Sequence, residues 1–240
     1  MSTLWVSIQD NLRFLGISVL ICAALIVVAL AAEALIMKNR HRLGGAHTVA
    51  FIAMFSAIAA ALMLIDFPLF FAPSFYKLDL SELPVLICTF YLGPVSGIVC
   101  EFLKIILKLL LKGTTTAFVG ELSNFLIGCS FVLPASIVYQ LLHSKKGAAV
   151  SLVVGALVMT VFGSFFNAWY LIPKFAELYG MPLDVIISMG TKVNASITDL
   201  KTLVLFAVVP FNLLKGVIDS VLAFLLYKRV EKLLFRRKKG

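Results

Sequence analysis

The chain has 240 residues and is unusually apolar, with 61% hydrophobic residues, 14% charged residues and a mean hydropathy of +1.05. Soluble domains carry about 25% charged residues, so the composition excludes an ordinary soluble protein and indicates an integral membrane protein in a lipid bilayer. The formal net charge of +9 would suggest a nucleic-acid partner in a soluble protein. Here the basic residues form three clusters that flank apolar runs, at residues 38–42, at 145–146 and in the tail from residue 228. The positive-inside rule explains that placement, and we expect no nucleic-acid partner.

The cysteines give no sign of a metal site. Cys22, Cys88, Cys100 and Cys129 all lie within apolar runs and show neither CxxC nor other metal-ligand spacing. We interpret them as small packing residues and expect no metal and no disulfide.

The first apolar runs predict membrane helices at residues 12–37 and 48–65, because about 20 apolar residues cross the bilayer core as a helix. Segment 66–79 is too rich in proline for a helix and too aromatic for an ordinary solvated loop. We expect it to be a loop packed against another part of the protein. The next helix should begin after Ser81, whose side chain is expected to cap it, with Pro84 in the first turn.

The dipeptide at residues 93–94, Gly-Pro, decides the topology of the rest of the chain. A tight turn there predicts separate helices at 83–92 and 94–111 and places all three basic clusters on one face of the membrane. A kink in one long helix would move the cluster at 145–146 to the opposite face. The positive-inside rule favours the turn, although it makes the helix at 83–92 short for a membrane span.

The remaining apolar runs predict helices at 119–142, 147–171 and 203–227. Seven membrane spans result, with the amino terminus outside and the carboxyl terminus in the cytoplasm. The predicted fold class is therefore an all-α membrane protein.

Amide and ammonium side chains interrupt the last two predicted helices, at Asn167, Asn212 and Lys215. Such groups are costly in hydrocarbon unless something polar meets them, so they are candidates for a ligand site. Asn212 and Lys215 share one helix face, and Pro210 leaves the carbonyl of Phe206 without its usual helical partner. An amide offers a donor beside an acceptor, whereas lysine offers donors alone. A planar ligand with alternating acceptors and an N–H donor suits this group.

Aromatic side chains near the amides offer faces on which a flat ring could stack. They are Phe165, Phe166, Trp169, Tyr170 and Phe211. The alternative is that the amides bridge helices and the aromatic residues only pack. Asp219 stands four residues after Lys215, so neutralisation of one by the other is a second alternative. Glu101 is expected to pair with Lys104 or Lys108 in a structural ion pair.

Several motifs of this chain resemble those of riboflavin-binding S components of energy-coupling-factor (ECF) vitamin transporters. They are KLDLSELP at 77–84, LGPVSG at 92–97, GELSNF at 120–125, the segment 167–173 and PFNLLKG at 210–216. The resemblance implies a six-helix S-component core at residues 47–232. It leaves an additional N-terminal transmembrane helix with a basic cytoplasmic loop at 1–46, and a basic cytoplasmic tail at 233–240. Neither the helix at 12–37 nor Asp219 belongs to the family pattern.

The function that this resemblance implies is the uptake of riboflavin, which binds from outside beneath segment 66–79 acting as a lid. It implies no enzymatic activity, no catalytic residue and no cofactor, since riboflavin is the transported ligand. Asn167, Asn212 and Lys215 match positions that hydrogen-bond the polar edge of the flavin ring. The complete set of substrate-binding residues implied by the resemblance is Asn167, Asn212, Lys215, Tyr76, Leu78, Gly113 and Thr114.

Transport also needs an energy source, and the sequence has no GxxxxGK[ST] loop to hold a nucleotide. The resemblance implies that an ECF transmembrane coupling protein and two ATPase subunits supply the energy. Ala53, Ala57 and Ala61 are spaced by four residues and give one helix a small-residue face for docking these partners, although ordinary helix packing uses the same pattern.

Two other functions stand as alternatives. The first is an S component for a different heteroaromatic vitamin. The second is a membrane-embedded hydrolase, for which the sequence lacks HExxH, GxSxG and a close pair of carboxylates.

Overall fold

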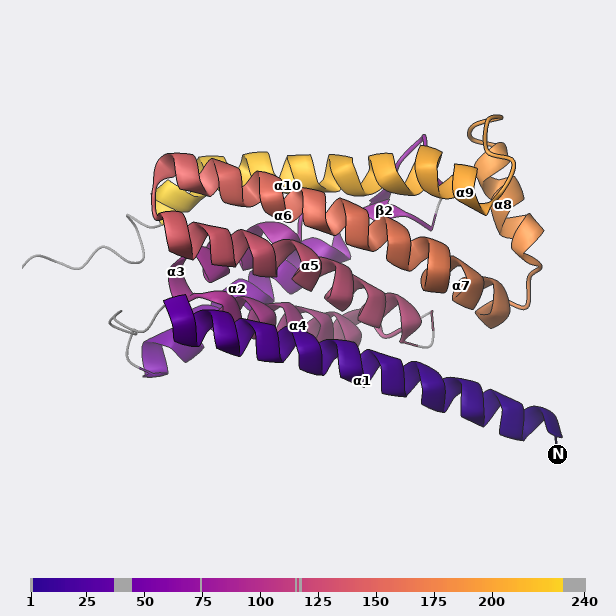
Figure 1. The fold of residues 1–240 in the computed structure, drawn as a ribbon, viewed down its shortest axis with the longest axis horizontal. Coiled ribbons are helices and arrows are strands. Elements are labelled where there is room, and N and C mark those ends of the chain that lie inside the picture. The colour runs from indigo at the N-terminus through magenta and orange to yellow at the C-terminus, as the bar shows by residue number, and fades with distance from the viewer. Residues whose placement is uncertain (1, 37–44, 74, 115, 117, 231–240) are drawn as a thin grey trace, which may run out of the picture.

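Helices make up nearly all of the structure, as expected for a chain that must satisfy its backbone hydrogen bonds inside hydrocarbon. The computed structural model describes residues 2–36, 45–73, 75–114, 116 and 118–230, and its long helices lie side by side in a bundle (Figure 1). Within these residues, five helical segments are long and apolar enough to cross a membrane. They are Val19–Ile36, Gly45–Leu64, Val119–Leu142, Lys145–Leu178 and Leu200–Val230. The prediction of an all-α membrane protein is confirmed.

The first half of the bundle contains α1 (Ser2–Ile36), α2 (Gly45–Leu64), α3 (Glu82–Leu92) and α4 (Pro94–Lys112). A single residue, Gly93, joins α3 to α4, and its φ of 98° is one that glycine adopts readily. The predicted tight turn is therefore confirmed and the kinked helix is excluded. Neither helix is among the five apolar segments above, because α3 is short for a membrane span and α4 carries several charged residues.

The turn at Gly93 folds α3 back onto α4 at very close range. A Cβ atom on Gly97 of α4 would lie 2.5 Å from Thr89 Oγ1 and 2.9 Å from a methyl group of Val132. The Thr89 hydroxyl in turn donates to the carbonyl of Gly93 at 3.0 Å. Only glycine at position 97 permits this approach without displacing its neighbours.

The helix predicted to end at residue 171 continues further. After α5 (Val119–Leu142) comes α6 (Lys145–Phe166), then a π-helical turn η1 (Asn167–Leu171), then α7 (Ile172–Leu178). The Ile172 N–H donates to the Asn167 carbonyl, five residues back. This wider turn ends two residues before Pro173, which has no N–H, and the helix continues through the proline instead of ending there.

The last long helix also begins earlier than predicted, and a short helix precedes it that the sequence did not predict, α8 (Leu183–Thr191). α9 (Leu200–Leu203) begins with a capping box in which Asp199 accepts from the Thr202 N–H, and this cap extends the helix at its start. A second π-helical turn, η2 (Val204–Val208), leads into α10 (Val209–Val230). η2 ends two residues before Pro210, as η1 ends two residues before Pro173.

Segment 66–79 folds over one end of the bundle. Its strands β1 (Phe67–Pro68) and β2 (Lys77–Leu78) pair antiparallel, with Phe67 opposite Leu78. Ala72, Tyr76 and Leu78 are buried in one apolar cluster with residues of α7 to α10. The prediction of a packed loop is confirmed. The predicted cap was wrong, because the Ser81 side chain makes no capping bond and accepts instead from Lys104 at 3.3 Å.

The N-terminal helix α1 packs against α4 and α5 and runs past them at its amino end (Figure 1). Its Ala29 and Ala32 are buried, and the Glu33 carboxylate accepts from the Val95 N–H at 3.2 Å, at the start of α4. Backbone N–H groups at a helix start lack intrahelical partners, so Glu33 stabilises the beginning of α4.

The close approach of α3 and α4 can be tested by adding one methyl group. We expect Gly97→Ala to destabilise the protein by about 1–3 kcal/mol, because the β-branched Thr89 and Val132 would have to move. The measurement is thermal unfolding of the purified protein in detergent. Gly16→Ala in α1 is the matched control, since its added Cβ meets nothing within 4 Å. Equal melting temperatures for both variants and the parent would contradict the close packing.

Candidate functional site

The predicted polar residues line one cavity. It has a volume of about 210 Å³ and is lined by residues of segment 66–79, α2, α4, α5, α10 and the region around η1. Asn167, Asn212 and Lys215 all contribute to its wall. All three are buried, so the cavity brings two amides and an ammonium together inside the bundle. Tyr76, in segment 66–79, lines the same cavity.

Asn167 is the first residue of the π-helical turn η1, and only 1% of its surface is exposed. Its amide nitrogen donates to the Gly163 carbonyl at 2.7 Å, and its Oδ1 accepts from the Tyr76 hydroxyl at 2.7 Å. Burial raises the pKa of Tyr76, so its hydroxyl stays protonated and able to donate. In this conformation Tyr76 of segment 66–79 occupies the Asn167 oxygen.

Asn212 lies on α10 just after Pro210, and its side chain faces α6 across a glycine. A Cβ atom on Gly163 would come within 3.0 Å of Asn212 Nδ2, so the two helices approach closely there. This buried amide nitrogen has no hydrogen-bond partner among the described residues. A buried donor without an acceptor is costly, which makes Asn212 the group best placed to meet a ligand.

Lys215 lies one turn after Asn212 and forms an ion pair with Asp79, with 3.0 Å between Nζ and Oδ2. Burial alone would raise the pKa of the Asp79 carboxyl, but the ammonium groups of Lys215 and Lys104 and hydrogen bonds from Ser81 outweigh it. The pKa of Asp79 therefore lies below its ordinary value, and the carboxylate stays charged. The alternative that Lys215 is paired with Asp219 was wrong.

A second buried ion-pair group lies beside the cavity. Lys104 Nζ lies 2.9 Å from Glu82 Oε1 and 2.5 Å from Glu101 Oε1, and the Lys104 side chain is fully buried. The predicted pair of Glu101 with Lys104 is confirmed. Glu82 also lines the cavity, so this group forms part of its wall. Lys108 pairs instead with Glu121 at 2.5 Å.

The remaining predicted site residues do not line the cavity. Leu78 is buried in the apolar cluster beneath segment 66–79, and Gly113 is exposed at the end of α4 with a φ of 69°. Thr114 donates to Glu121 at 2.9 Å, and Glu121 and Thr116 do line the cavity. The turn after α4 therefore reaches the cavity through these neighbours.

The aromatic walls also differ from the prediction. Phe165 and Trp169 are 68% and 65% exposed and face away from the cavity. Of the predicted stacking residues, Phe211 lines it, and it is joined by Phe75 and Phe175. The ring centroids of Tyr76 and Phe211 lie 5.3 Å apart.

Several polar residues that line the cavity were not in the predicted set of substrate-binding residues. They are Asp66, Lys77, Asp79, Glu82, Lys108, Thr116, Glu121, Ser123 and Asn124. Most of them lie within or next to the motifs at 77–84 and 120–125, which was the available signal.

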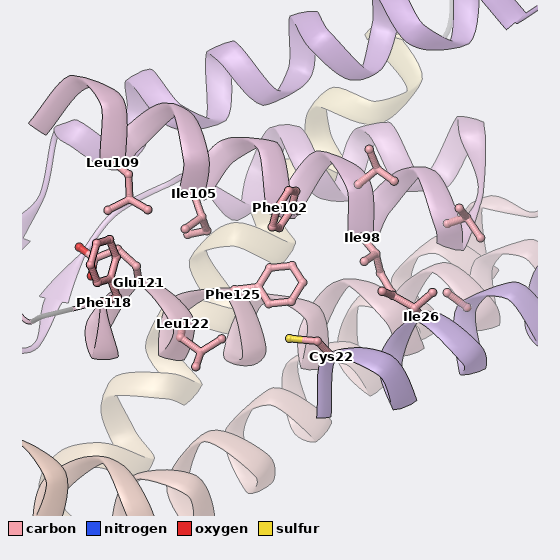
Figure 2. Close-up of a pocket in the computed structure, with 13 residues that line it drawn as sticks. Cys22, Ile26, Ile98, Phe102, Ile105, Leu109, Phe118, Glu121, Leu122 and Phe125 are labelled. Atoms are coloured by element: carbon pink, nitrogen blue, oxygen red, sulfur yellow. The ribbon is translucent and has the colours of Figure 1, made fainter. Parts of the chain in front are cut away.

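A larger hollow lies elsewhere, between α1, α4 and α5, with a volume of about 470 Å³ (Figure 2). Figure 2 shows apolar side chains such as Ile26, Phe102 and Phe125 around it. Among the described residues that line it, Glu121 alone is charged, and it already accepts hydrogen bonds from Lys108 and Thr114. This hollow lacks the polar groups that orient a polar ligand, so the smaller cavity is the candidate site.

Comparisons with known proteins point the same way. The family described as ECF transporter, substrate-specific component, matches residues 47–227. The riboflavin transporter FmnP of Bacillus subtilis is 32% identical over 75% of this chain and 90% of its own length. The riboflavin transporter RibU of Staphylococcus aureus is 37% identical over 77% of this chain and 90% of its own length. A solved S component of a bacterial ECF transporter superposes with a TM-score of 0.61 at 35% identity, covering 79% of this chain and 98% of that one.

The buried ion-pair group predicts a specific stability defect. Lys104→Met should destabilise the protein by about 3–5 kcal/mol, because two buried carboxylates lose their counter-ion. Adding Glu82→Gln and Glu101→Gln should recover most of that loss, since no charge then stays uncompensated. Thermal unfolding measures both effects, and Lys146→Met at the exposed start of α6 is the control. Parent-like stability of Lys104→Met would contradict the assignment.

Proposed function

The chain belongs to the family of ECF transporter substrate-specific components, and on that premise we propose that it binds riboflavin for uptake across the membrane. The family is one of transporter subunits and not of enzymes. The observation that carries the proposal is the convergence of Asn167, Asn212 and Lys215 on one aromatic-walled cavity. Relatives named as riboflavin transporters support the identity of the ligand.

The chemistry of these side chains suits the polar edge of a flavin ring, which carries carbonyls and one imide N–H. The free amide N–H of Asn212 and the ammonium of Lys215 are donors for the carbonyls. The amide oxygens of Asn167 and Asn212 are acceptors for the imide N–H. Phe211 and Tyr76 supply aromatic faces for the ring. Leu78, and Gly113 with Thr114 in the turn after α4, are assigned to the outer part of the site, around the ribityl chain.

Binding requires the cavity to widen. Its volume of about 210 Å³ falls below the roughly 300–1,000 Å³ of typical ligand pockets. Segment 66–79 is the wall that can withdraw, because it is a short hairpin and not a membrane helix. We assign it the role of a lid that opens to admit riboflavin and closes over it.

We assign the six-helix core to residues 47–232, comprising α2, α3, α4, α5, the helix from α6 to α7 and the helix from α9 to α10. The family match begins at residue 47, which supports α1 as an addition within residues 1–46. Residues 233–240 form the proposed cytoplasmic tail and lie outside the described part of the chain.

The charge distribution supports an outward-facing cavity and a cytoplasmic carboxyl terminus. Lys145 and Lys146 open α6, whereas Asn167 follows its other end. Lys228 and Arg229 lie near the end of α10. The start of α6 and the end of α10 lie at the same end of the bundle, away from strand β2 of segment 66–79 (Figure 1). By the positive-inside rule that end faces the cytoplasm. The predicted basic cluster at residues 38–42, and the part of the tail cluster from residue 231 on, lie outside the described residues.

Energy comes from separate subunits in this proposal, an ECF transmembrane coupling protein and two ATPases. Ala53, Ala57 and Ala61 are all exposed on α2. Their neighbours Ser56 and Ala60 face the core instead. Ordinary packing within the described part of the chain therefore does not account for the alanine stripe, and we assign it to docking of the coupling protein.

The ligand assignment is tested most cleanly at Asn212. Its amide nitrogen makes no hydrogen bond to the described residues, so Asn212→Ala removes none of that kind. We expect riboflavin binding to weaken by about 1–3 kcal/mol, since a flavin carbonyl loses its donor in a buried site. Titration of the purified protein with riboflavin, followed by fluorescence quenching, measures the dissociation constant. Asn194→Ala, in the connection after α8, is the control. Unchanged affinity in Asn212→Ala would contradict the assigned pocket.

The docking surface is tested separately from the pocket. We expect Ala57→Leu to leave riboflavin affinity of the isolated chain unchanged and to reduce uptake strongly in cells that also make the energising subunits. The added side chain would hold the partner helix away from the alanine stripe. Ala149→Leu, an exposed alanine on α6, is the matched control. Uptake at the parental rate by Ala57→Leu would exclude this stripe as the contact surface.

A further inference from the structure

Asp219 is a buried carboxyl group that neither the pocket contacts nor the family motif accounts for. It lies on α10 with no exposed surface, and neither of its carboxylate oxygens has a hydrogen-bond partner among the described residues. A buried carboxyl group without a donor is costly, so a partner for it in another conformation would lower that cost. Asp219 stands one helical turn after Lys215, on the same face.

Lys215 depends for its counter-ion on the segment that has to move. Its partner Asp79 directly follows strand β2, at the end of the hairpin that covers the cavity. The proposed function requires that hairpin to withdraw, because the cavity of about 210 Å³ is too small for a flavin. Withdrawal stretches or breaks the pair and would leave a buried ammonium without a carboxylate, which is strongly unfavourable.

The replacement has to be a carboxylate within reach that does not move with the hairpin. Asp219 meets both conditions, since carboxylate and ammonium four residues apart on one helix can pair and both lie on α10. Glu82 also lines the cavity, and its Oε2 has no hydrogen-bond partner among the described residues, but its charge is already matched by Lys104, whose Nζ lies 2.9 Å from Oε1. Asp219 has no such ion pair among the described residues. Rotation of the flexible Lys215 side chain is then sufficient to exchange Asp79 for Asp219, and no backbone movement of α10 is needed.

We propose that Asp219 is the second counter-ion of Lys215 and a positioning residue of the riboflavin site. The ammonium turns from Asp79 to Asp219 when segment 66–79 withdraws and returns when the segment closes. This keeps Lys215 charged inside the membrane and directed into the open cavity, where a flavin carbonyl can reach it. The inference rests on the proposed function, because admission of riboflavin is what requires the segment to withdraw.

A double-mutant cycle tests the exchange of partners. The variants are Asp79→Asn, Asp219→Asn and the double change in the full-length protein, with riboflavin association and dissociation followed by stopped-flow fluorescence. Asp219→Asn should slow association several-fold, because opening now leaves Lys215 unpaired. The double variant should lose affinity by about tenfold more than the product of the two single effects, since residues that share a partner are not additive.

Two further variants define the control and the rescue. Asp219→Glu retains a carboxylate and should restore the parental association rate, whereas a purely structural defect would persist. Asp184→Asn, on the exposed face of α8, should have no effect. Additive single effects would overturn the proposal. The proposal would also be overturned if the loss of affinity beyond the product of the single effects appeared in Asp79→Asn combined with Glu82→Gln, and not in Asp79→Asn combined with Asp219→Asn.

A measurement without ligand separates this proposal from the choice of riboflavin. In the unliganded protein, hydrogen exchange of the amides at residues 75–79 reports opening of the segment. Asp219→Asn should slow this exchange, because Lys215 then has Asp79 alone, and Asp79→Asn should speed it. This result stands even if riboflavin fails to bind. Identical exchange in the parent and in Asp219→Asn would overturn the counter-ion role.

Discussion

A lysine buried inside an apolar bundle needs a carboxylate beside it, and two buried lysines of the described residues organise this protein. Lys104 joins Glu82 at the start of α3 to Glu101 on α4, and Lys215 joins α10 to Asp79 just before α3. Apolar packing cannot orient these helices uniquely, because lipid chains solvate apolar surface as well as a neighbouring helix does. The ion pairs have one good geometry each, so they determine how α3, α4 and α10 stand around the cavity.

The irregular turns of the two longest cavity helices follow from the same constraint. Each helix carries a π-helical turn that ends two residues before a proline, η1 before Pro173 and η2 before Pro210. Backbone groups released by proline must find partners, and irregular backbone within a membrane protein is tolerated where it lines a protein cavity. Asn167 begins the first of these turns, and Asn212 follows the second by four residues. The prolines therefore put helix irregularity and polar side chains at one place.

How much of this was predictable from the sequence depends on the range of the interactions involved. The turn at Gly93 was predicted because glycine and proline act locally, and most spans were predicted because apolar length is a local property. The partner of Lys215 was not, since Asp79 lies 136 residues away and Asp219 was the nearer carboxylate in sequence. The prediction that Phe165 and Trp169 face the ligand was wrong for a related reason. A membrane helix is apolar on all sides, so its sequence does not tell which aromatic side chains face lipid and which face a cavity.

The site in this conformation already satisfies most of the groups that a ligand would use. Tyr76 holds the oxygen of Asn167 and Asp79 holds the ammonium of Lys215, and both partners belong to segment 66–79. A flavin that takes those hydrogen bonds exchanges one partner for another, so these contacts alone give little net affinity. The net gain has to come from burial of the flat ring between aromatic side chains and from the unpartnered amide of Asn212. Because a ligand at the proposed site would compete with the segment for the same two side chains, occupancy of the cavity and position of the segment would be thermodynamically linked. In the proposed function an energising partner has to distinguish the loaded from the empty subunit, and this linkage would let it do so through the position of segment 66–79.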